Sequence, residues 1–452
     1  MSKHFDIIIK HGTILQMDKG LNVLTDHVVA IRDRKICAIE PLAHFTVNAG
    51  VEGVSFHSAR TVIDATDCIV MPGLINAHTH LPMSYMRGLA DDLPLDKWLK
   101  DYIWPAEDKL LNDELGDKFI YDATLYGAAE VIRSGTTMVS DMYFKGEQMG
   151  RALVDAGLRG IIGEAVTDLI QANGKDRIGE YAVDMNREFA STNLVEFSVA
   201  PHAIYSCSEN VLRKCAKAAI DNDLLLHIHI SESEKERNDC IVKHGKRPVE
   251  YLAQTGFLDA RTILAHGIWV DKDELTLLAE RNISVATCTE SNLKLCSGIL
   301  PLRDYMETGV NLCLATDGAA SNNNLDLFTE MDTTAKIHKM INHDPALLPA
   351  HDVVKMVTCN AAKAIYREHE LGSLLPGYLA DITIVALDTL NSQPIFNPYS
   401  HLVYALNGHN VRDVIINGKL VLKNRKLTTL DEKALIATAK HYQEKICRIL
   451  PL

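Results

Sequence analysis

Short apolar runs alternate with longer amphipathic stretches through most of this chain. Eight of the runs are rich in Val, Ile and Leu and have the length of β-strands. The stretches 116–135, 210–223 and 271–282 repeat apolar positions at helical spacing. Strands alternating with helices indicate an α/β fold, and eight such units form a (β/α)8 (TIM) barrel. The predicted strands are 71–78, 136–142, 158–166, 195–205, 224–232, 261–268, 283–289 and 310–318.

Both ends of the chain show a different pattern, in which short strand-like runs alternate with tight turns. It occupies residues 5–66 and 380–427, and Asn417-Gly418 is a strong hairpin signal. We therefore predict that the two ends meet in one small β-sandwich. The predicted domains are 1–66 (first sandwich part), 67–368 (barrel) and 369–452 (second sandwich part with a helix over about 431–450).

Composition narrows the class of protein. The length of 452 residues suits a barrel with an accessory unit. The formal net charge of -13 argues against nucleic acid as a partner, because phosphate binding favours a basic surface. No apolar run is long enough to predict a membrane span. The 10 cysteines show no disulfide or C-x-x-C spacing, so we expect a cytoplasmic protein.

Two histidines one residue apart end the first barrel strand. Side chains at this spacing on a strand point to the same face, so His78 and His80 can bind one ion. His229, His266 and Asp317 follow other apolar runs, and a parallel barrel delivers such groups to one mouth. A catalytic zinc ion takes nitrogen and oxygen ligands and keeps a site open for water. The predicted ligands are His78, His80, His229 and Asp317.

Three residues are candidates for proton transfer at this site. Asp317 can accept a proton from the bound water, which ionises near neutral pH. His266 can orient the resulting hydroxide. Glu232, three residues beyond His229, could protonate a ring nitrogen, although a solvated loop acid is the alternative interpretation. His227 shares the face of His229, and we predict that it packs one layer deeper.

Longer motifs extend this pattern to a known family. The chain contains MPGLINAHTHLPMSYMRGLADDLPLDKWL, LLLHIHISESEKE, TILAHGIWV and LATDGAASNNNLDLFTEM. These stretches resemble amidohydrolase-superfamily deaminases of the triazine-hydrolase-like branch, most closely the methylthioadenosine/S-adenosylhomocysteine deaminase group. GSLLPGYLADITIV is similar to the accessory sandwich of that family, so the resemblance covers nearly the whole chain.

The resemblance implies a hydrolytic deaminase of purine salvage that converts 5'-methylthioadenosine, adenosine and S-adenosylhomocysteine to inosine analogues and ammonia. One Zn2+, with Fe2+ as the other candidate, would be held by the four ligands above. Glu232 would pass a proton to purine N1, and His266 would assist attack at C6. The resemblance also implies a homo-oligomer, either a dimer or a tetramer.

Substrate contacts are implied in the same way. Glu107 matches the residue that accepts hydrogen bonds from ribose hydroxyls, although an acid at a helix start is the alternative. His202 matches a histidine that contacts the substrate, as Glu232 and Asp317 also would. Arg177 matches an arginine that reaches the distal end of the substrate.

One departure from the family pattern bears on the substrate. Members that bind homocysteine carry an arginine about where this chain has Glu164. A carboxylate there would repel the homocysteine carboxylate. The sequence therefore favours methylthioadenosine and adenosine over S-adenosylhomocysteine.

Two alternatives stay open. The first is an s-triazine or guanine aminohydrolase on the same scaffold. Guanine-directed relatives tend to carry glutamine where this chain has Met83, which argues against guanine as the substrate. Triazine hydrolysis is harder to exclude, because triazine hydrolases share the fold and the metal site and differ only in the pocket lining. The second is a barrel without metal that serves as a scaffold, which the full set of ligands and proton-transfer residues argues against.

Overall fold

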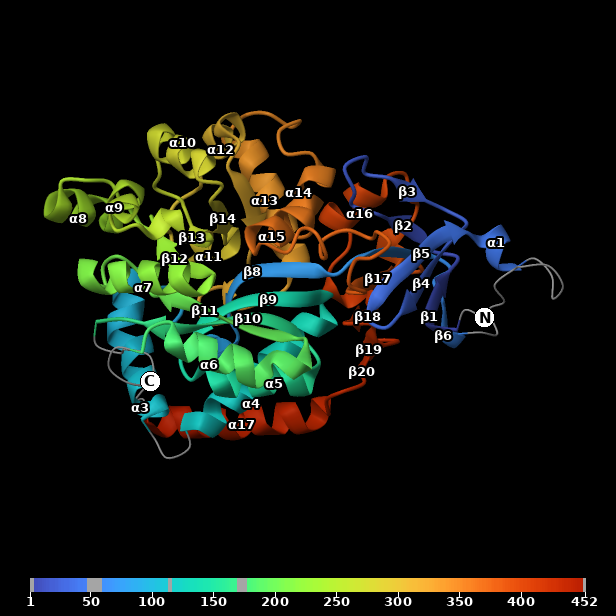
Figure 1. Ribbon diagram of the computed structural model, residues 1–452, viewed down its shortest axis with the longest axis horizontal. Coiled ribbons are helices and arrows are strands. Elements are labelled where there is room, and N and C mark those ends of the chain that lie inside the picture. Colours follow the sequence, from blue (N-terminus) through green and yellow to red (C-terminus); the bar gives the residue numbers. More distant parts are fainter. Residues whose placement is uncertain (1–3, 47–58, 113–115, 169–176, 450–452) are drawn as a thin grey trace.

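A curled parallel sheet lies at the centre of the molecule (Figure 1). The computed structural model describes residues 4–46, 59–112, 116–168 and 177–449. Nine strands pair in the order β15-β14-β13-β12-β11-β10-β9-β8-β16, all parallel, and every predicted strand contributes to them. They are β8 (Leu74–His80), β9 (Thr136–Tyr143), β10 (Arg159–Val166), β11 (Val195–Pro201), β12 (Leu226–Ile230), β13 (Thr262–His266), β14 (Ser284–Thr287), β15 (Asn311–Leu314) and β16 (Asp317–Gly318).

Two predicted strands are each divided in the structure. The first breaks at Gly73, where a Cβ atom would lie 2.1 Å from Thr137 Oγ1, so this close crossing requires glycine. The last breaks between β15 and β16, where Asn76 supplies hydrogen bonds in place of a neighbouring backbone. Asn76 Oδ1 accepts from the Thr316 N–H at 3.1 Å, and its Nδ2 donates to Thr316 Oγ1 at 2.7 Å. This arrangement lets Asp317 lie beside β8.

Amphipathic helices follow the strands where the sequence predicts them. The three helices expected from spacing are α4, α7 and α10, and α10 begins with a capping box in which Asp271 accepts from the Glu274 N–H at 3.0 Å. The helices between strands are α4 (Gly116–Arg133), α5 (Gly146–Ala156), α6 (Glu180–Phe189), α7 (Glu209–Asn222), α8 (Glu234–His244), α9 (Pro248–Gln254), α10 (Lys272–Glu280), α11 (Thr289–Lys294), α12 (Leu302–Thr308), α13 (Leu327–Ile341), α14 (Ala350–Met356) and α15 (Cys359–Ala364).

A segment of short helices lies between β8 and α4. It begins directly after His80 and carries Glu107 on its last helix. The segment consists of the 3-10 helix η2 (Leu81–Met86), α2 (Leu95–Trp98), the π-helix η3 (Leu99–Ile103) and α3 (Trp104–Leu111).

Two smaller sheets lie together at one side of the molecule (Figure 1). One has the order β5-β4-β1-β6 and the other β20-β19-β18-β17-β7-β2-β3, so the second contains strands from both chain ends. One buried cluster joins Ile7 and Ile31 of the first sheet to Val70, Ile384 and Ile415 of the second. The strands are β1 (Phe5–Lys10), β2 (Thr13–Leu15), β3 (Val23–Leu24), β4 (His27–Arg32), β5 (Lys35–Pro41), β6 (Ala59–Asp64), β7 (Cys68–Pro72), β17 (Ile382–Ala386), β18 (Val411–Ile416), β19 (Lys419–Lys423) and β20 (Lys426–Leu427).

The remaining helices include α1 (Leu42–Thr46), α16 (Pro398–Tyr404) and α17 (Glu432–Ile449). The last confirms the predicted C-terminal helix, and it packs on α4 and on η2. Tyr442 of α17 stacks on Tyr85 at 5.1 Å and meets Phe119 at 5.2 Å between ring centroids. The C-terminal helix therefore supports the segment that follows the H-x-H pair.

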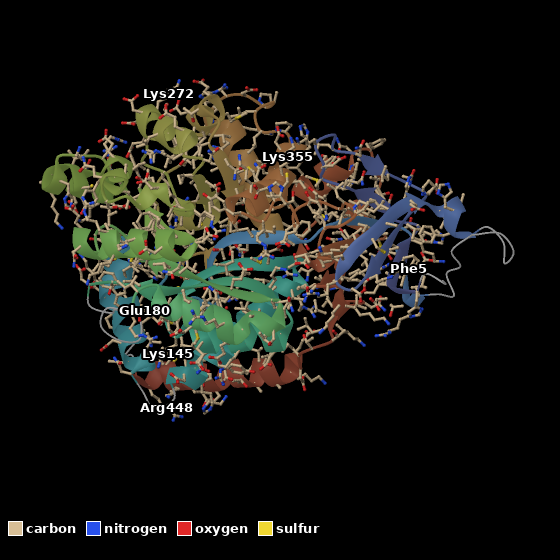
Figure 2. All side chains as sticks on the ribbon, viewed as in Figure 1. Phe5, Lys145, Glu180, Lys272, Lys355 and Arg448 are labelled. Carbon is tan, nitrogen blue, oxygen red and sulfur yellow. The ribbon has the colours of Figure 1, made fainter. Side chains whose placement is uncertain are left out.

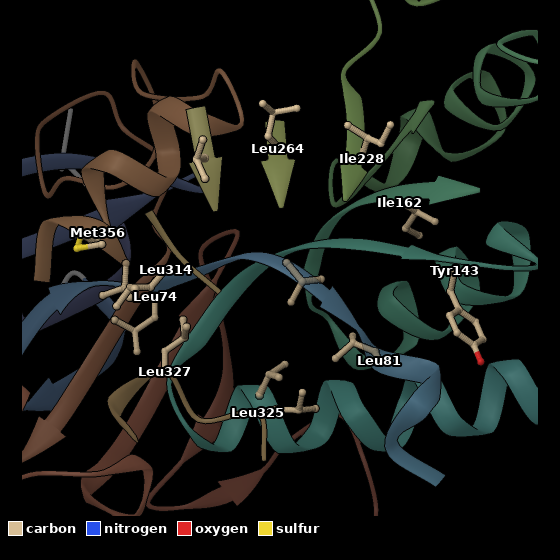
Figure 3. Packing of buried hydrophobic residues seen from close by; sticks show 14 of the residues in the cluster. Leu74, Leu81, Tyr143, Ile162, Ile228, Leu264, Leu314, Leu325, Leu327 and Met356 are labelled. Atoms are coloured by element: carbon tan, nitrogen blue, oxygen red, sulfur yellow. The ribbon is translucent and has the colours of Figure 1, made fainter. Parts of the chain in front are cut away.

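Apolar side chains of the large sheet pack against the surrounding elements (Figure 3). Leu74, Ile162, Ile228 and Leu264 of four different strands are fully buried. Each such side chain contributes roughly 1.5–3 kcal/mol relative to an exposed one. Charged side chains such as Lys272 lie at the periphery (Figure 2). Across the described ranges, no helix is both long enough and apolar enough to cross a bilayer.

Candidate metal centre and active site

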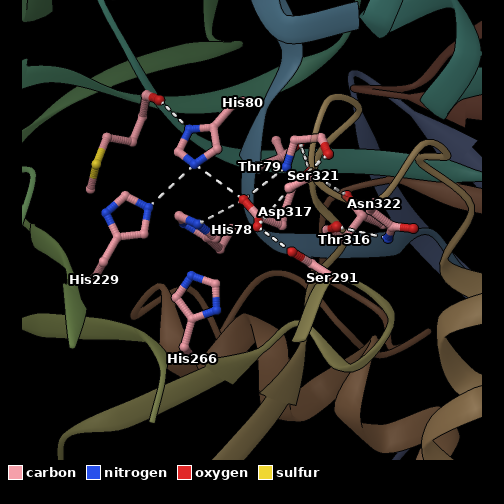
Figure 4. Close-up of polar contacts among 12 residues, drawn as sticks. His78, Thr79, His80, His229, His266, Ser291, Thr316, Asp317, Ser321 and Asn322 are labelled. Atoms are coloured by element: carbon pink, nitrogen blue, oxygen red, sulfur yellow. Dashed lines mark hydrogen bonds and ion pairs between the residues drawn. The ribbon is translucent and has the colours of Figure 1, made fainter. Parts of the chain in front are cut away.

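The ends of four strands bring five polar side chains together (Figure 4). His78 and His80 come from β8, His229 from β12, His266 from β13 and Asp317 from β16. Asp317 Oδ1 lies 3.6 Å from His78 Nε2 and 3.2 Å from His80 Nε2. His229 Nε2 lies 3.3 Å from His80 Nε2.

This arrangement fits a divalent cation. Donor atoms about 2.0–2.1 Å from a tetrahedral zinc ion are roughly 3.3 Å from one another, which matches the separations above. His78, His80 and Asp317 offer ligand atoms that all lie within 4.8 Å of one another, as do His78, His229 and His266. Buried His78 Nε2 has no hydrogen-bond partner among the described residues. A buried polar atom without a partner is costly, and a cation would satisfy it.

Each imidazole predicted to be a ligand is oriented through its other nitrogen. His80 Nδ1 donates to the Met142 carbonyl at 2.5 Å, and His229 Nδ1 donates to the His202 carbonyl at 2.7 Å. His78 Nδ1 lies 2.9 Å from Nε2 of the fully buried His227. His227 therefore lies behind the ligands, as predicted from its position, but it also orients His78. Such outer contacts fix the tautomer and aim the free nitrogen at the ion.

Glu232 and His266 face each other beside the ligands. Glu232 Oε2 lies 3.8 Å from His266 Nε2, and both side chains are buried. Burial raises the pKa of the Glu232 carboxyl above its usual range. A carboxyl group with a raised pKa can carry a proton at neutral pH and donate it. The alternative interpretation of Glu232 as a solvated loop acid is wrong, because the side chain is only 5% exposed.

The backbone at the site is left-handed at two of these residues. His266 has φ of +73° and Asp317 has φ of +62°. Non-glycine residues in this region carry a conformational cost of about 1–3 kcal/mol, and such residues cluster at functional sites.

A cavity of about 1010 Å³ opens above the cluster. Glu107 lies in its wall, is buried, and accepts a hydrogen bond from Tyr143 Oη at 2.6 Å. Burial raises the pKa of Glu107 to about 7. His202 also lines the cavity, and burial lowers the pKa of its imidazole to about 4, so it is neutral near pH 7. Apolar side chains complete the wall: Met83, Leu95, Trp98, Leu99, Ile103, Trp104, Leu111, Phe144 and Leu295.

Glu164 and Arg177 occupy different environments. Glu164 lines the cavity and accepts from the backbone N–H groups of Lys145 at 3.1 Å and Gly146 at 2.5 Å, at the start of α5. Arg177 is not among the cavity-lining residues; its Nη2 lies 2.5 Å from Asp184 Oδ2, and its side chain is 47% exposed. The described residues therefore bring together every predicted site residue except Arg177.

Sequence reasoning missed several polar groups around the centre. Ser291 and Ser321 donate to Asp317 Oδ2 at 2.7 and 2.8 Å, and Asn292 Oδ1 accepts from His266 Nδ1 at 2.9 Å. The polar stretch that follows the strand predicted at 283–289 was the available signal. It carries Ser291 and Asn292 at the same edge of the sheet as the ligands.

Comparison with known proteins defines the class. The chain belongs to the amidohydrolase family, whose pattern matches residues 69–421. Within that family its relatives include a 5-methylthioadenosine/S-adenosylhomocysteine deaminase of Thermodesulfovibrio yellowstonii, which is 42% identical over 83% of this chain and 85% of the relative. The resemblance drawn from the sequence motifs is thereby confirmed.

Two further relatives agree with this placement. A 5'-deoxyadenosine deaminase of Methanothermobacter thermautotrophicus is also 42% identical, over 84% of this chain and 88% of the relative. The crystal structure of an adenosine deaminase from Xanthomonas campestris with bound zinc covers 99% of both chains, with a TM-score of 0.92 and 33% identity.

Proposed function

We propose that this protein is a metal-dependent deaminase that converts 5'-methylthioadenosine and adenosine to the inosine analogues and ammonia. The observation that carries the proposal is the convergence of three imidazoles and one carboxylate beside the buried Glu232–His266 pair. The relatives of 42% identity are named as deaminases of adenine nucleosides. They do not favour the triazine and guanine alternatives.

The metal would be one Zn2+ or Fe2+ held by His78, His80, His229 and Asp317. Their spacing, and the unpartnered His78 Nε2, support this ligand set. Such a cation, when bound, supplies a water nucleophile that ionises near neutral pH. In this assignment His266 is not a ligand, and its Nε2 faces Glu232 at 3.8 Å while its Nδ1 is held by Asn292.

Residues of the chain would carry out the proton transfers and bind the substrate. Glu232 would give its proton to purine N1 as water adds to C6, while His266 would orient the water and Asp317 would accept its proton. Asp317 would then pass that proton to the amino group, which leaves as ammonia, and the hydroxyl proton of the adduct would return to Glu232 as the C6 carbonyl forms. Glu107, held by Tyr143, would accept hydrogen bonds from the ribose hydroxyls, and His202 would contact the substrate from the opposite wall.

Substrate preference follows from the far part of the cavity. The apolar side chains of Trp98, Ile103 and Phe144 suit a methylthio group. Glu164 disfavours the carboxylate of S-adenosylhomocysteine whenever it is ionised, although burial raises its pKa to about 7. A contact between Arg177 and the distal end stays a prediction, since its guanidinium pairs with Asp184 in this structure.

The architecture proposed for this activity is a closed (β/α)8 barrel over 67–368. Pairing of β16 with β8 and of β15 with β14 supports closure. The packed end sheets support a sandwich built from 1–66 and 369–452, with β7 as a shared strand.

A cytoplasmic location agrees with the ten free thiols. Assembly into a homodimer or homotetramer stays a prediction, and analytical ultracentrifugation would measure the oligomeric state.

The test is a direct comparison of substrates on purified, zinc-loaded protein. The adenine-to-hypoxanthine absorbance change would be followed with methylthioadenosine, adenosine and S-adenosylhomocysteine, and the guanine-to-xanthine change with guanine. We expect fast turnover of the first two, slower turnover of the third and none of the last. Absence of turnover with every adenine nucleoside would refute the proposed function, and ametryn or atrazine would then be assayed as triazine substrates.

A further inference from the structure

One short helix contacts two reacting groups that come from different strands. Ser291 Oγ donates to Asp317 Oδ2 at 2.7 Å, and the adjacent Asn292 accepts from His266 Nδ1 at 2.9 Å. Both residues belong to α11 and are 0% and 2% exposed. Figure 4 shows Ser291 reaching Asp317 from the side opposite His80. The helix thus holds His266 of β13 and Asp317 of β16 in a fixed mutual arrangement.

The contact to His266 selects one tautomer of the imidazole. An acceptor at Nδ1 keeps the proton on that atom, which leaves the Nε2 lone pair facing Glu232 at 3.8 Å. The contact from Ser291 to Asp317 gives the two carboxylate oxygens different partners. Oδ2 is held by Ser291 and Ser321, while Oδ1 faces the ligand histidines.

The helix is itself anchored to α13. The Glu290 N–H lies 3.3 Å from both carboxyl oxygens of Glu330, which is fully buried. Thr334 Oγ1 donates to Thr289 Oγ1 at 2.7 Å, and Thr333 donates to Glu290 at 2.9 Å. These contacts limit the movement of α11 relative to α13, so Ser291 and Asn292 act from a well-anchored helix.

We propose that Asn292 and Ser291 are positioning residues that set the tautomer of His266 and the orientation of Asp317. They touch neither the purine nor the ribose in this assignment and act only through their partners. The kinetic part of the proposal rests on the deaminase function proposed above, whereas the tautomer and the metal retention can be measured without it.

The first experiment compares Asn292→Ala with Asn292→Asp in the zinc-loaded protein. Loss of the acceptor should lower kcat by roughly 10–100-fold, as removal of such outer contacts does. KM should change less than about threefold, because ground-state binding is untouched. Asp keeps an acceptor for Nδ1–H and should restore most of kcat. Asn360→Ala is the matched control, since Asn360 donates to the Leu312 carbonyl at 3.0 Å, away from the reacting groups.

The second experiment does not use activity. In 15N-histidine NMR spectra, assigned with His266→Gln, the His266 ring should be protonated at Nδ1 in the parent and in Asn292→Asp, and should shift toward the other tautomer in Asn292→Ala. The double variant Ser291→Ala/Ser321→Ala should lose zinc faster than the parent during dialysis against a chelator, while melting close to the parent after zinc is restored.

Distinct outcomes overturn distinct claims. An inactive parent protein with the expected tautomer shift would refute the proposed function and leave the positioning role intact. An active parent with normal kcat in Asn292→Ala, or with Asn292→Asp no better than Asn292→Ala, would overturn the role of Asn292. Unchanged zinc retention in the double serine variant would overturn the role of Ser291.

Discussion

At the scale of single residues, the site depends on strain and burial together. His266 and Asp317 both adopt left-handed backbone; His266 donates a hydrogen bond to Asn292 of α11, and Asp317 accepts one from Ser291 of α11. The contacts that hold these conformations offset a cost of about 1–3 kcal/mol for each residue. Burial also raises the pKa of Glu232 above its usual range and that of Glu107 to about 7, which favours the protonated form of each carboxyl group relative to an exposed one.

Glu232→Gln tests the proton donor. The amide cannot deliver a proton to purine N1, so kcat should fall by about 10²–10⁴-fold with KM little changed. The assay is the absorbance change with adenosine. Glu234→Gln is the control, since Glu234 is exposed and pairs with Arg237, and it should retain parent activity. Equal loss in both variants would contradict a specific role for Glu232.

The ribose contact should give a pH dependence. The pKa of Glu107 is raised to about 7, so the carboxyl is neutral below that pH and ionised above it. The ionised form accepts stronger hydrogen bonds from the two hydroxyls than the neutral form does, so kcat/KM for adenosine should rise with pH and level off above about 7. This rise of kcat/KM with pH should be absent with 2',3'-dideoxyadenosine, which lacks both hydroxyls. An identical profile for the two substrates would exclude Glu107 as its source.

At the scale of elements, the spacing of apolar residues along the sequence predicted the strands and helices correctly. It could do so because the direction of a side chain depends on the local backbone conformation. The H-x-H spacing placed His78 and His80 on one face, and most of the apolar runs ended at or near a group that lines the cavity, with β14 as an exception. The same reasoning could not find the division of the first strand at Gly73, which depends on Thr137 of the next strand. Nor could it pair Tyr143 with Glu107, since the path of α3 is set by tertiary packing.

A buried ion pair joins the large sheet to the end sheets. Arg159 of β10 donates to Asp381, just before β17, through Nε at 2.8 Å and Nη2 at 3.1 Å, and both side chains are nearly inaccessible. Arg159→Met leaves the carboxylate buried without its partner and should lower the free energy of unfolding by roughly 3–5 kcal/mol. Adding Asp381→Asn should recover part of that loss. Urea denaturation of the three proteins measures both effects.

At the scale of the whole molecule, the proposed metal site predicts that metal binding and folding are coupled. The four proposed ligands come from three strands that are far apart in the sequence, so an ion bound to them would stabilise only the folded state. Chelation should abolish activity and lower Tm, and zinc at 1,000 times its Kd should return about 4 kcal/mol. Differential scanning calorimetry measures the shift. A Tm independent of zinc would argue against a bound ion at these residues.

The pairing of β16 with β8 also has a kinetic consequence. Thr79 and Asp317 meet across 238 positions of sequence, so their contact is among the most expensive to form in chain entropy. An intermediate that has not made this contact lacks a complete ligand set. Zinc capture during refolding, followed with a fluorescent chelator, should therefore trail the recovery of helical circular dichroism. Zinc binding would then report the moment during folding at which the metal site is complete.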